Sequence, residues 1–283
     1  MRKIKLGLFL LATVAVTNLC ATTAAEKFNE MPFMGQLFQI EENSSLNAIA
    51  EKSQGWFRKS NVERWDVVSE MDDDQASVVR KEATIAGFFG EMKPTDISKY
   101  DAIVIMGAAA PAFERRFEMA KNLLDEGFET KYVIAITGER ELSEKPEPSE
   151  LWPRETFRKE CDVAHYFMKA LTSGENNFTK MVLETSRVYD QGEERRPNSY
   201  DTLETLKALF ERKGENIEKL LIVTNQPYGF GQRAMARSIF PNCQVDVAAA
   251  KSNADNVAPE VIIDTLAKWL LAEKRTADAL QNQ

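Results

Sequence analysis

The chain has 283 residues, of which 43% are hydrophobic and 28% are charged. These proportions are typical of a globular protein, and they exclude collagen-like, coiled-coil and disulfide-rich scaffolds. The 36 Lys and Arg residues face 44 Asp and Glu residues, so the formal net charge is −8. Because an acidic surface repels nucleic-acid phosphates, we expect no nucleic-acid partner.

Residues 1–25 have the three-part pattern of a secretory signal peptide. Arg2, Lys3 and Lys5 precede an apolar run over residues 6–16, and the small residues Thr23-Ala24-Ala25 follow as a cleavage site. The run is too short for a membrane span, which needs ~20 residues. We therefore expect an exported protein, periplasmic or secreted, whose net charge moves from −8 to −11 when the three basic residues are removed. No later run is long enough to span a membrane.

The segment 26–97 is predicted to be a helical N-terminal extension. Ser45 and its neighbours precede an apolar-periodic stretch from Leu46, as helix-capping residues do. A second helix is expected over residues 77–89, with acidic residues 72–74 at its start, the end that the helix dipole favours. The segment has no strand-like alternation of apolar and polar residues.

Residues 98–283 alternate short apolar runs with amphipathic segments, which predicts repeated βα units around a parallel sheet. The expected strands are Ala102–Met106, Tyr132–Ile136, Met181–Leu183, Leu220–Val223 and Val245–Val247. The expected helices are Pro111–Asp125, Arg154–Leu171, Ser199–Lys213, Phe230–Phe240 and Pro259–Lys274. Gly127, Gly174 and Gly214 stand where helix ends need a positive φ. The predicted fold class is α/β, a Rossmann-like three-layer sandwich with a mainly parallel sheet of about five strands.

Ligands of such sheets bind beyond the carboxyl ends of the strands, so the residues after each apolar run are the candidate site. After the first strand, Gly107 and Ala108 allow an anion to approach the start of a helix, although a tight turn without ligand explains them equally well. Arg115 or Arg116, one turn into that helix, is a candidate for binding a carboxylate or phosphate. The chain lacks the glycine-rich dinucleotide fingerprint and the phosphate-binding loop, so we expect no nucleotide cofactor.

The other strand ends are also polar. The second strand ends in Thr137-Gly138-Glu139-Arg140 and continues into a long loop, 139–153, of the kind that is often functional. A basic loop with Arg195 and Arg196 leads into Asn198, which caps a helix or binds ligand, followed by Asp201 and Thr202. The fourth strand ends in Thr224-Asn225, with Arg233 in the next helix.

Residue types that carry metal or nucleophilic chemistry are few. His165 is the only histidine, and no GxSxG motif supplies a serine for a triad. Cys161 and Cys243 remain after signal removal, and they either pair or stay as thiols. Binding of a divalent ion by Glu139, Glu160 or Asp201 is an open alternative that no motif supports.

The order of these features resembles the envelope-associated SanA/ElyC/YdcF-like family, whose biochemical function is unknown. The matching stretch runs from Tyr100 to about Cys243. In chain order, the counterparts are residues 101–107, Arg116, Thr137-Gly138-Glu139, Glu160, the stretch 198–202, the stretch 224–228, and Arg233-Ala234. Three identities differ from the family pattern: Ala108 and Glu139 replace glycines, and the histidine expected before Arg233 is missing.

The resemblance implies a Rossmann-like domain in the cell envelope that binds an anionic small molecule or a lipid-linked precursor. In this hypothesis Gly107 and Ala108 cradle the anion while Arg116 and Arg233 neutralise it. The residues that would orient it are Asn198, Asp201, Thr202 and Asn225, and Thr137 and Gly138 are further candidate ligand-binding residues. Glu139 or Glu160 is the candidate general base or metal ligand, because a carboxylate in a closed cleft can have a raised pKa. Asp201 is a further candidate catalytic carboxylate. If the protein is a hydrolase, cleavage of a phosphoester or diphosphate is the expected reaction class; whether it is an enzyme stays open.

The alternative is a non-catalytic interaction module that keeps the fold and has lost the chemistry. Its docking surface for a protein partner would be the aromatic N-terminal region with Trp56, Phe57 and Trp65, although burial in a core explains these aromatics as well.

Overall fold

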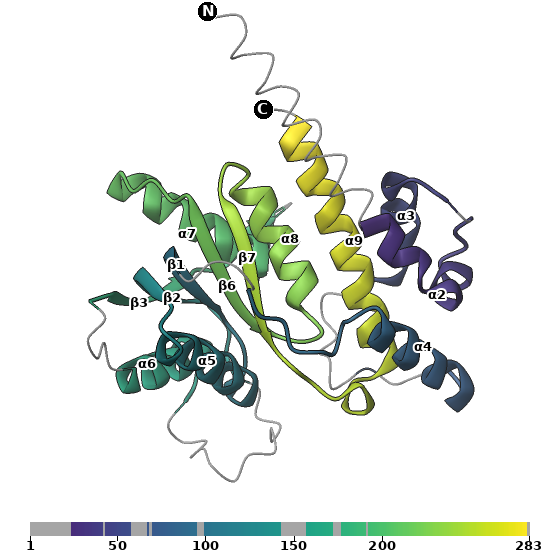
Figure 1. Ribbon diagram of the computed structural model, residues 1–283, viewed down its shortest axis with the longest axis horizontal. Helices are drawn as coiled ribbons and strands as arrows, with labels where there is room; N and C mark the ends of the chain where they lie inside the picture. Colours follow the sequence, from purple (N-terminus) through teal and green to yellow (C-terminus); the bar gives the residue numbers. More distant parts are fainter. Residues whose placement is uncertain are drawn as a thin grey trace, which may run out of the picture. The chain divides into compact units, whose positions relative to one another are not determined.

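A computed structural model describes most of the chain (Figure 1). The described residues are 24–41, 43–57, 67, 70–94, 99–142, 157–171, 177–190 and 192–281. The signal-peptide prediction falls on residues 1–23, outside this part, apart from Ala24 and Ala25 at the start of a helical stretch, 24–29. None of the helices within the described ranges combines the length and the apolar character that crossing a membrane requires.

The chain divides into two compact units. The sheet unit contains Glu91–Asn225 and Asn242–Ala250, and the helical unit contains Met1–Gly90, Gln226–Pro241 and Lys251–Gln283. The sequence-based boundary between 97 and 98 separates segments along the chain, whereas each compact unit combines segments that are distant in sequence.

Five parallel strands form the sheet, and each contains one of the predicted apolar runs. Their bounds are β1 Lys99–Met106, β2 Glu129–Gly138, β3 Thr179–Thr185, β6 Lys219–Asn225 and β7 Gln244–Ala250. The strand order is β3-β2-β1-β6-β7, with β1 in the centre (Figure 1). The predicted α/β class with a mainly parallel, Rossmann-like sheet is confirmed.

Helices of the sheet unit cover both faces of the sheet. On one face, α5 (Ala110–Asp125) and α6 (Glu160–Ala170) bury Phe113 and Phe167 against Ile103, Ile105 and Val133. Neighbouring residues of a strand point to opposite faces. The side chain of Tyr132 accordingly lies on the other face, where it contacts Phe210 of α7 (Ser199–Lys213). The sheet therefore has a core on each side.

Three predicted helices differ from the structure by more than one residue at a boundary. The helix predicted from Arg154 begins at Glu160, because residues 158–160 pair with residues 140–142: the Leu142 N–H donates to the Arg158 carbonyl and the Glu160 N–H donates to the Arg140 carbonyl. The Asp162 carboxylate also accepts the N–H groups of Arg158 and Lys159, both at 2.8 Å. The helix predicted over 77–89 is α4, Asp73–Ile85, capped by Asp72. The helix predicted to end at Lys274 continues as α9, Pro259–Gln281.

Glycine has the expected role at two helix ends. Gly127 and Gly214 have φ of +95° and +65° after α5 and at the end of α7. Gly174 lies outside the described residues. A short hairpin, β4 Val188–Asp190 with β5 Glu193–Arg195, was not predicted, because its strands have only three residues each.

The helical unit packs around α9. Its other helices include the stretch 24–29, α2 Pro32–Leu37, α3 Leu46–Ser53, α8 Gly229–Ile239 and α4, with short 3₁₀ turns at Gln54–Trp56 and Ala254–Asn256. Ser45 caps α3, as predicted, by accepting the Ala48 N–H. Trp269 of α9 is 2% exposed and contacts Phe88 and Phe230, so aromatic residues form the centre of this core.

Candidate functional site

A buried charged group holds the carboxyl ends of the central strands together. Arg116, only 3% exposed, extends from α5 to the ends of β1 and β6. Its Nη1 donates to the carbonyls of Met106 and Gly107 at 2.9 and 2.6 Å, and its Nε donates to Oδ1 of Asn225 at 2.7 Å. Arg116 thus lies at the predicted strand edge together with Asn225, and these contacts give its guanidinium a structural role.

Glu160 meets the same edge from the first turn of α6. It is 6% exposed, its Oε1 accepts from Nη1 of Arg140 at 3.1 Å, and its Oε2 lies 3.4 Å from the N–H of Gly138. A Cβ added to Gly107 would lie 3.1 Å from this Oε2. We call Gly107, Arg116, Arg140, Glu160 and Asn225 the strand-end cluster.

The two glycines of this edge are required by the packing of the chain itself. A Cβ at Gly107 would lie 2.7 Å from the carbonyl oxygen of Ile136 and 3.0 Å from Cα of Thr137. A Cβ at Gly138 would lie 2.8 Å from Cγ of Pro197. Ala108, 8% exposed, belongs to the core under α5 and α6. Close approach of a ligand is therefore not needed to explain these small residues.

Three threonine hydroxyls are buried at the carboxyl ends of strands and have no hydrogen-bond partner among the described residues. They belong to Thr137 of β2, Thr185 of β3 and Thr224 of β6. Thr137 and Thr224 are 0% exposed, and Thr185 is 7% exposed. Native proteins satisfy most buried polar groups, so a set of unsatisfied ones at the ligand edge of a parallel sheet calls for an explanation.

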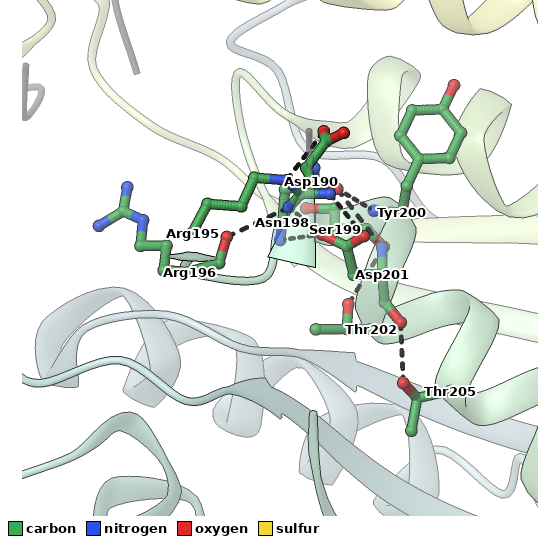
Figure 2. A network of polar contacts seen from close by, with 9 residues as sticks. All are labelled: Asp190, Arg195, Arg196, Asn198, Ser199, Tyr200, Asp201, Thr202 and Thr205. Carbon is green, nitrogen blue, oxygen red and sulfur yellow. Dashed lines mark hydrogen bonds and ion pairs between the residues drawn. The ribbon is translucent and has the colours of Figure 1, made fainter. Parts of the chain in front are cut away.

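A second polar cluster surrounds the start of α7 (Figure 2). Arg195 donates from Nη1 and Nη2 to the two Asp201 oxygens at 2.6 and 3.0 Å, and its Nε lies 3.4 Å from Asp190. Asn198 caps α7 by accepting the N–H groups of Tyr200 and Asp201, and its own N–H donates to Asp201 at 2.7 Å. We call Asp190, Arg195, Asn198 and Asp201 the hairpin cluster.

Three candidate site residues near the start of α7, Asn198, Asp201 and Thr202, form hydrogen bonds within this segment of the chain. Partial burial raises the pKa of Asp201, but the hydrogen bonds from Arg195 and from the Asn198 N–H lower this pKa by more, so it lies below its usual value. The Thr202 hydroxyl donates to the Ser199 carbonyl at 3.1 Å. In Figure 2, Arg196 and Tyr200 point away from the Arg195–Asp201 pair. The contacts around Asp201 are those of a capping box with an ion pair.

Glu139 has the opposite pKa direction from the one that a general base needs. The backbone N–H of Arg187, 3.2 Å from its carboxylate, is the main cause that lowers the pKa of Glu139, and Lys159 at 3.5 Å adds to it. The expectation of a raised pKa is therefore wrong for Glu139. A carboxylate with a lowered pKa accepts a proton weakly.

The described residues do not assemble a metal site or an activated nucleophile. Within them, no three His, Cys, Asp or Glu side chains come together as they would around a metal ion. His165 is exposed on α6. Cys161 and Cys243 are free thiols, and burial, the largest cause in both, raises their pKa values to about 11 and about 12. Thiols with such pKa values are poor nucleophiles at neutral pH.

Arg233 lies in the helical unit, on α8. Its Nε is buried without a hydrogen-bond partner in the described part of the chain, and it interacts electrostatically with Glu273 of α9. Glu273 also accepts from the Trp269 indole at 3.0 Å. Convergence of Arg116 and Arg233 on one ligand stays a prediction, because the two residues belong to different units.

The aromatic docking surface of the alternative hypothesis is described in part. Trp56 is 36% exposed, with its ring 6.0 Å from that of Phe38, whereas Phe57 packs against the core of the helical unit. Trp65 lies outside the described residues. Of the two described aromatics, Trp56 and Phe57, Trp56 is therefore the one with the exposure that docking requires.

Two residues of the edge were missed as site residues by the sequence analysis. The sequence indicates Arg140 only as a charged residue after the second strand, whereas in the structure it forms an ion pair with buried Glu160. Pro197, which covers Gly138, gave no signal beyond its place before a helix cap. Comparison of the chain with protein-family models, with curated proteins and with solved structures gave no match.

Proposed function

We propose that the protein binds a small molecule bearing a phosphate or carboxylate at the carboxyl edge of its sheet, beside the strand-end cluster. One observation carries the proposal: the Thr137 hydroxyl is fully buried at the end of β2 and lacks a hydrogen-bond partner in the described part of the chain. A buried polar group left unsatisfied costs ~1–3 kcal/mol. A ligand oxygen that accepts a hydrogen bond from this hydroxyl would recover that energy.

The position of Thr137 supports the proposal. Met106 pairs with Ile136, so the next residues, Gly107 and Thr137, lie side by side at the strand ends. By the alternation of side chains, Thr137 faces the same side of the sheet as Val133 and Ala135, which is the side of α5 and α6. The hydroxyl therefore lies on the side from which Arg116 and Glu160 approach.

The local charge favours an anion over a cation. The strand-end cluster combines two arginines, Arg116 and Arg140, with one carboxylate, Glu160, in a chain whose net charge is −8. The start of α5 adds to this, because its N-cap residue, Ala109, has no side-chain oxygen to satisfy the first N–H groups. Free N–H groups and the helix dipole both attract negative charge.

A hydrolytic step on a phosphoester or diphosphate is the further part of this proposal. Glu160 is the carboxylate of the strand-end cluster, and its helix, α6, packs on the side of the sheet that Thr137 faces. Glu160 is therefore the residue whose replacement by glutamine should abolish release of inorganic phosphate from a phosphomonoester. The secretory pattern of residues 1–25 and the resemblance to the SanA/ElyC/YdcF-like family support a role in the cell envelope, with a lipid-linked precursor as one source of the anionic group.

Thermal unfolding with inorganic phosphate, a sugar phosphate and a dicarboxylate tests the binding. A ligand at ~100 Kd stabilises the native state by about 2.7 kcal/mol, which raises Tm by about 5 °C in a chain of this size. In Thr137→Val, which keeps the side-chain shape and removes the hydroxyl, the shift should be lost while the ligand-free Tm is equal or higher.

The matched control is Thr130→Val, at the other end of the same strand. The Thr130 hydroxyl donates to the Tyr132 carbonyl at 2.9 Å, so this variant should keep the full ligand shift. The proposal fails if none of the anions stabilises the wild-type chain, or if Thr137→Val retains the shift. Either result would favour the interaction-module alternative.

A further inference from the structure

β3 is an edge strand of the sheet in the described part of the chain. β3 ends the strand order, and within the described ranges only β2 pairs with it (Figure 1). Thr179, Lys180 and Glu184 are exposed, and Met181, Val182 and Leu183 are half-buried. Such an edge presents backbone N–H and C=O groups that a further strand can pair with.

The sequence of β3 is complementary to itself. It reads Thr-Lys-Met-Val-Leu-Glu-Thr, with Val182 in the centre. When two copies are laid antiparallel about Val182, Lys180 stands opposite Glu184 of the second copy, and Met181 stands opposite Leu183. Thr179 stands opposite Thr185. Each position therefore meets a residue of opposite charge or of similar kind.

The faces of the strand agree with this pairing. Lys180, Val182 and Glu184 are in register with Val133, Ala135 and Thr137, so all three lie on the α5 and α6 side of the sheet. Residues directly opposite in an antiparallel pair share a face, with Cβ atoms ~5 Å apart, and opposite charges there stabilise the pair. The two-fold symmetry produces the Lys180–Glu184 contact twice.

We propose that two copies of this chain associate through β3, which forms one continuous sheet across a two-fold axis. A second copy is favoured as the occupant because the charge pattern matches its own reverse. A parallel arrangement would place Lys180 beside Lys180 and would not close as a dimer. Lys180 already donates to the Leu171 carbonyl at 2.7 Å, and its ammonium group has further protons for the Glu184 carboxylate.

A charge swap tests the pairing by sedimentation of the full chain at up to ~100 µM, a range that detects micromolar dissociation constants. The wild-type chain should sediment at twice the monomer mass of 32.0 kDa. Lys180→Glu and Glu184→Lys should each weaken the dimer by about tenfold or more, since each places like charges opposite one another twice. The double variant Lys180→Glu/Glu184→Lys should recover the dimer, because it restores both pairs.

Lys99→Glu is the matched control. Lys99 is an exposed lysine that pairs with Glu129, as Lys180 is proposed to pair with Glu184 of the second copy. It lies at the start of the central strand β1, away from the edge strand. This variant should remain a dimer. The proposal is overturned by a monomeric wild-type chain, by a dimer insensitive to either single variant, by failure of the double variant to recover, or by loss of the dimer in Lys99→Glu. Circular dichroism of each variant separates dissociation from unfolding.

Discussion

The strand-end cluster and the hairpin cluster are built from the same residue types, an arginine, a carboxylate and an asparagine, but they differ in burial. Arg116 and Glu160 are 3% and 6% exposed, whereas the side chains of Arg195 and Asp190 are 36% and 60% exposed. When its partner is removed, a buried polar group stays unsatisfied, and the protein loses stability by the full cost of desolvating that group. An exposed group forms hydrogen bonds with water instead, so the loss is small. The same chemical change should therefore have a large effect at the strand ends and a small one at the hairpin.

The largest effect is expected for Arg116→Met. The change leaves the carbonyls of Met106 and Gly107 and the amide oxygen of Asn225 without the arginine donor. Each hydrogen bond from a charged donor to such a group contributes ~1.5–3 kcal/mol, so the loss of three should lower the free energy of unfolding by about 3 kcal/mol or more. Urea denaturation measures it. Arg115→Met, at the exposed neighbouring position, should change the stability by less than about 0.5 kcal/mol.

A smaller loss is expected for Gly107→Ala. The new Cβ would lie 2.7 Å from the Ile136 carbonyl oxygen, a backbone atom, so β1 and β2 must shift, at a cost of about 1–3 kcal/mol. The hairpin glycine, Gly192, has open space around it, and its replacement by alanine is opposed only by a φ of +85°. Gly192→Ala should therefore cost about 1 kcal/mol. Equal losses in thermal melts of the two variants would contradict this difference.

The smallest effect is expected for Asp201→Asn, which keeps an oxygen for the Asn198 N–H and removes the charge that Arg195 binds. Because the pair is partly exposed, the loss at pH 7 should be about 1 kcal/mol. The pKa of Asp201 is lowered by folding, so its stabilisation is present above the usual value of about 3.9 and is lost as the pH falls through the lowered pKa.

Melts of wild type and Asp201→Asn from pH 7 downwards check this sign. The difference in stability should shrink as the solution becomes acidic. Asp190→Asn is the comparison, since its 3.4 Å contact and 60% exposed side chain predict a change within about 0.5 kcal/mol at any pH. A constant difference across the pH range would contradict the assigned role of Asp201.

Local features of the sequence predicted most of the sheet unit. The five apolar runs became the five strands, and Ser199–Lys213 was predicted with both its ends, because Asn198 and Gly214 are capping residues whose effect is local. The start of α6 was missed because Arg158 and Lys159 are held extended by pairing with residues 140–142, a contact that no local pattern encodes.

For the candidate site, the sequence predicted which residues stand at the strand ends but not what they contact. Gly107, Arg116, Thr137, Glu160 and Asn225 do lie at that edge. Two of them have partners that the sequence did not indicate: Glu160 pairs with Arg140, and the guanidinium of Arg116 binds strand carbonyls rather than standing ready for a ligand. A side chain of this length reaches several groups, and only the packed strands decide which of them it meets.

By itself, the sequence determined the order of the five sheet strands and of the helices between them, the caps of α3 and α7, and the polar character of the strand ends, because these depend on residues close together in the chain. The tertiary structure alone decided the grouping of α8 and α9 with the N-terminal helices and the buried partners of Arg116 and Glu160. It also decided that the Thr137 hydroxyl is buried without a hydrogen-bond partner among the described residues. The physical reason is that burial and hydrogen-bond satisfaction depend on atoms that are distant in sequence and meet only when the sheet and its helices pack together.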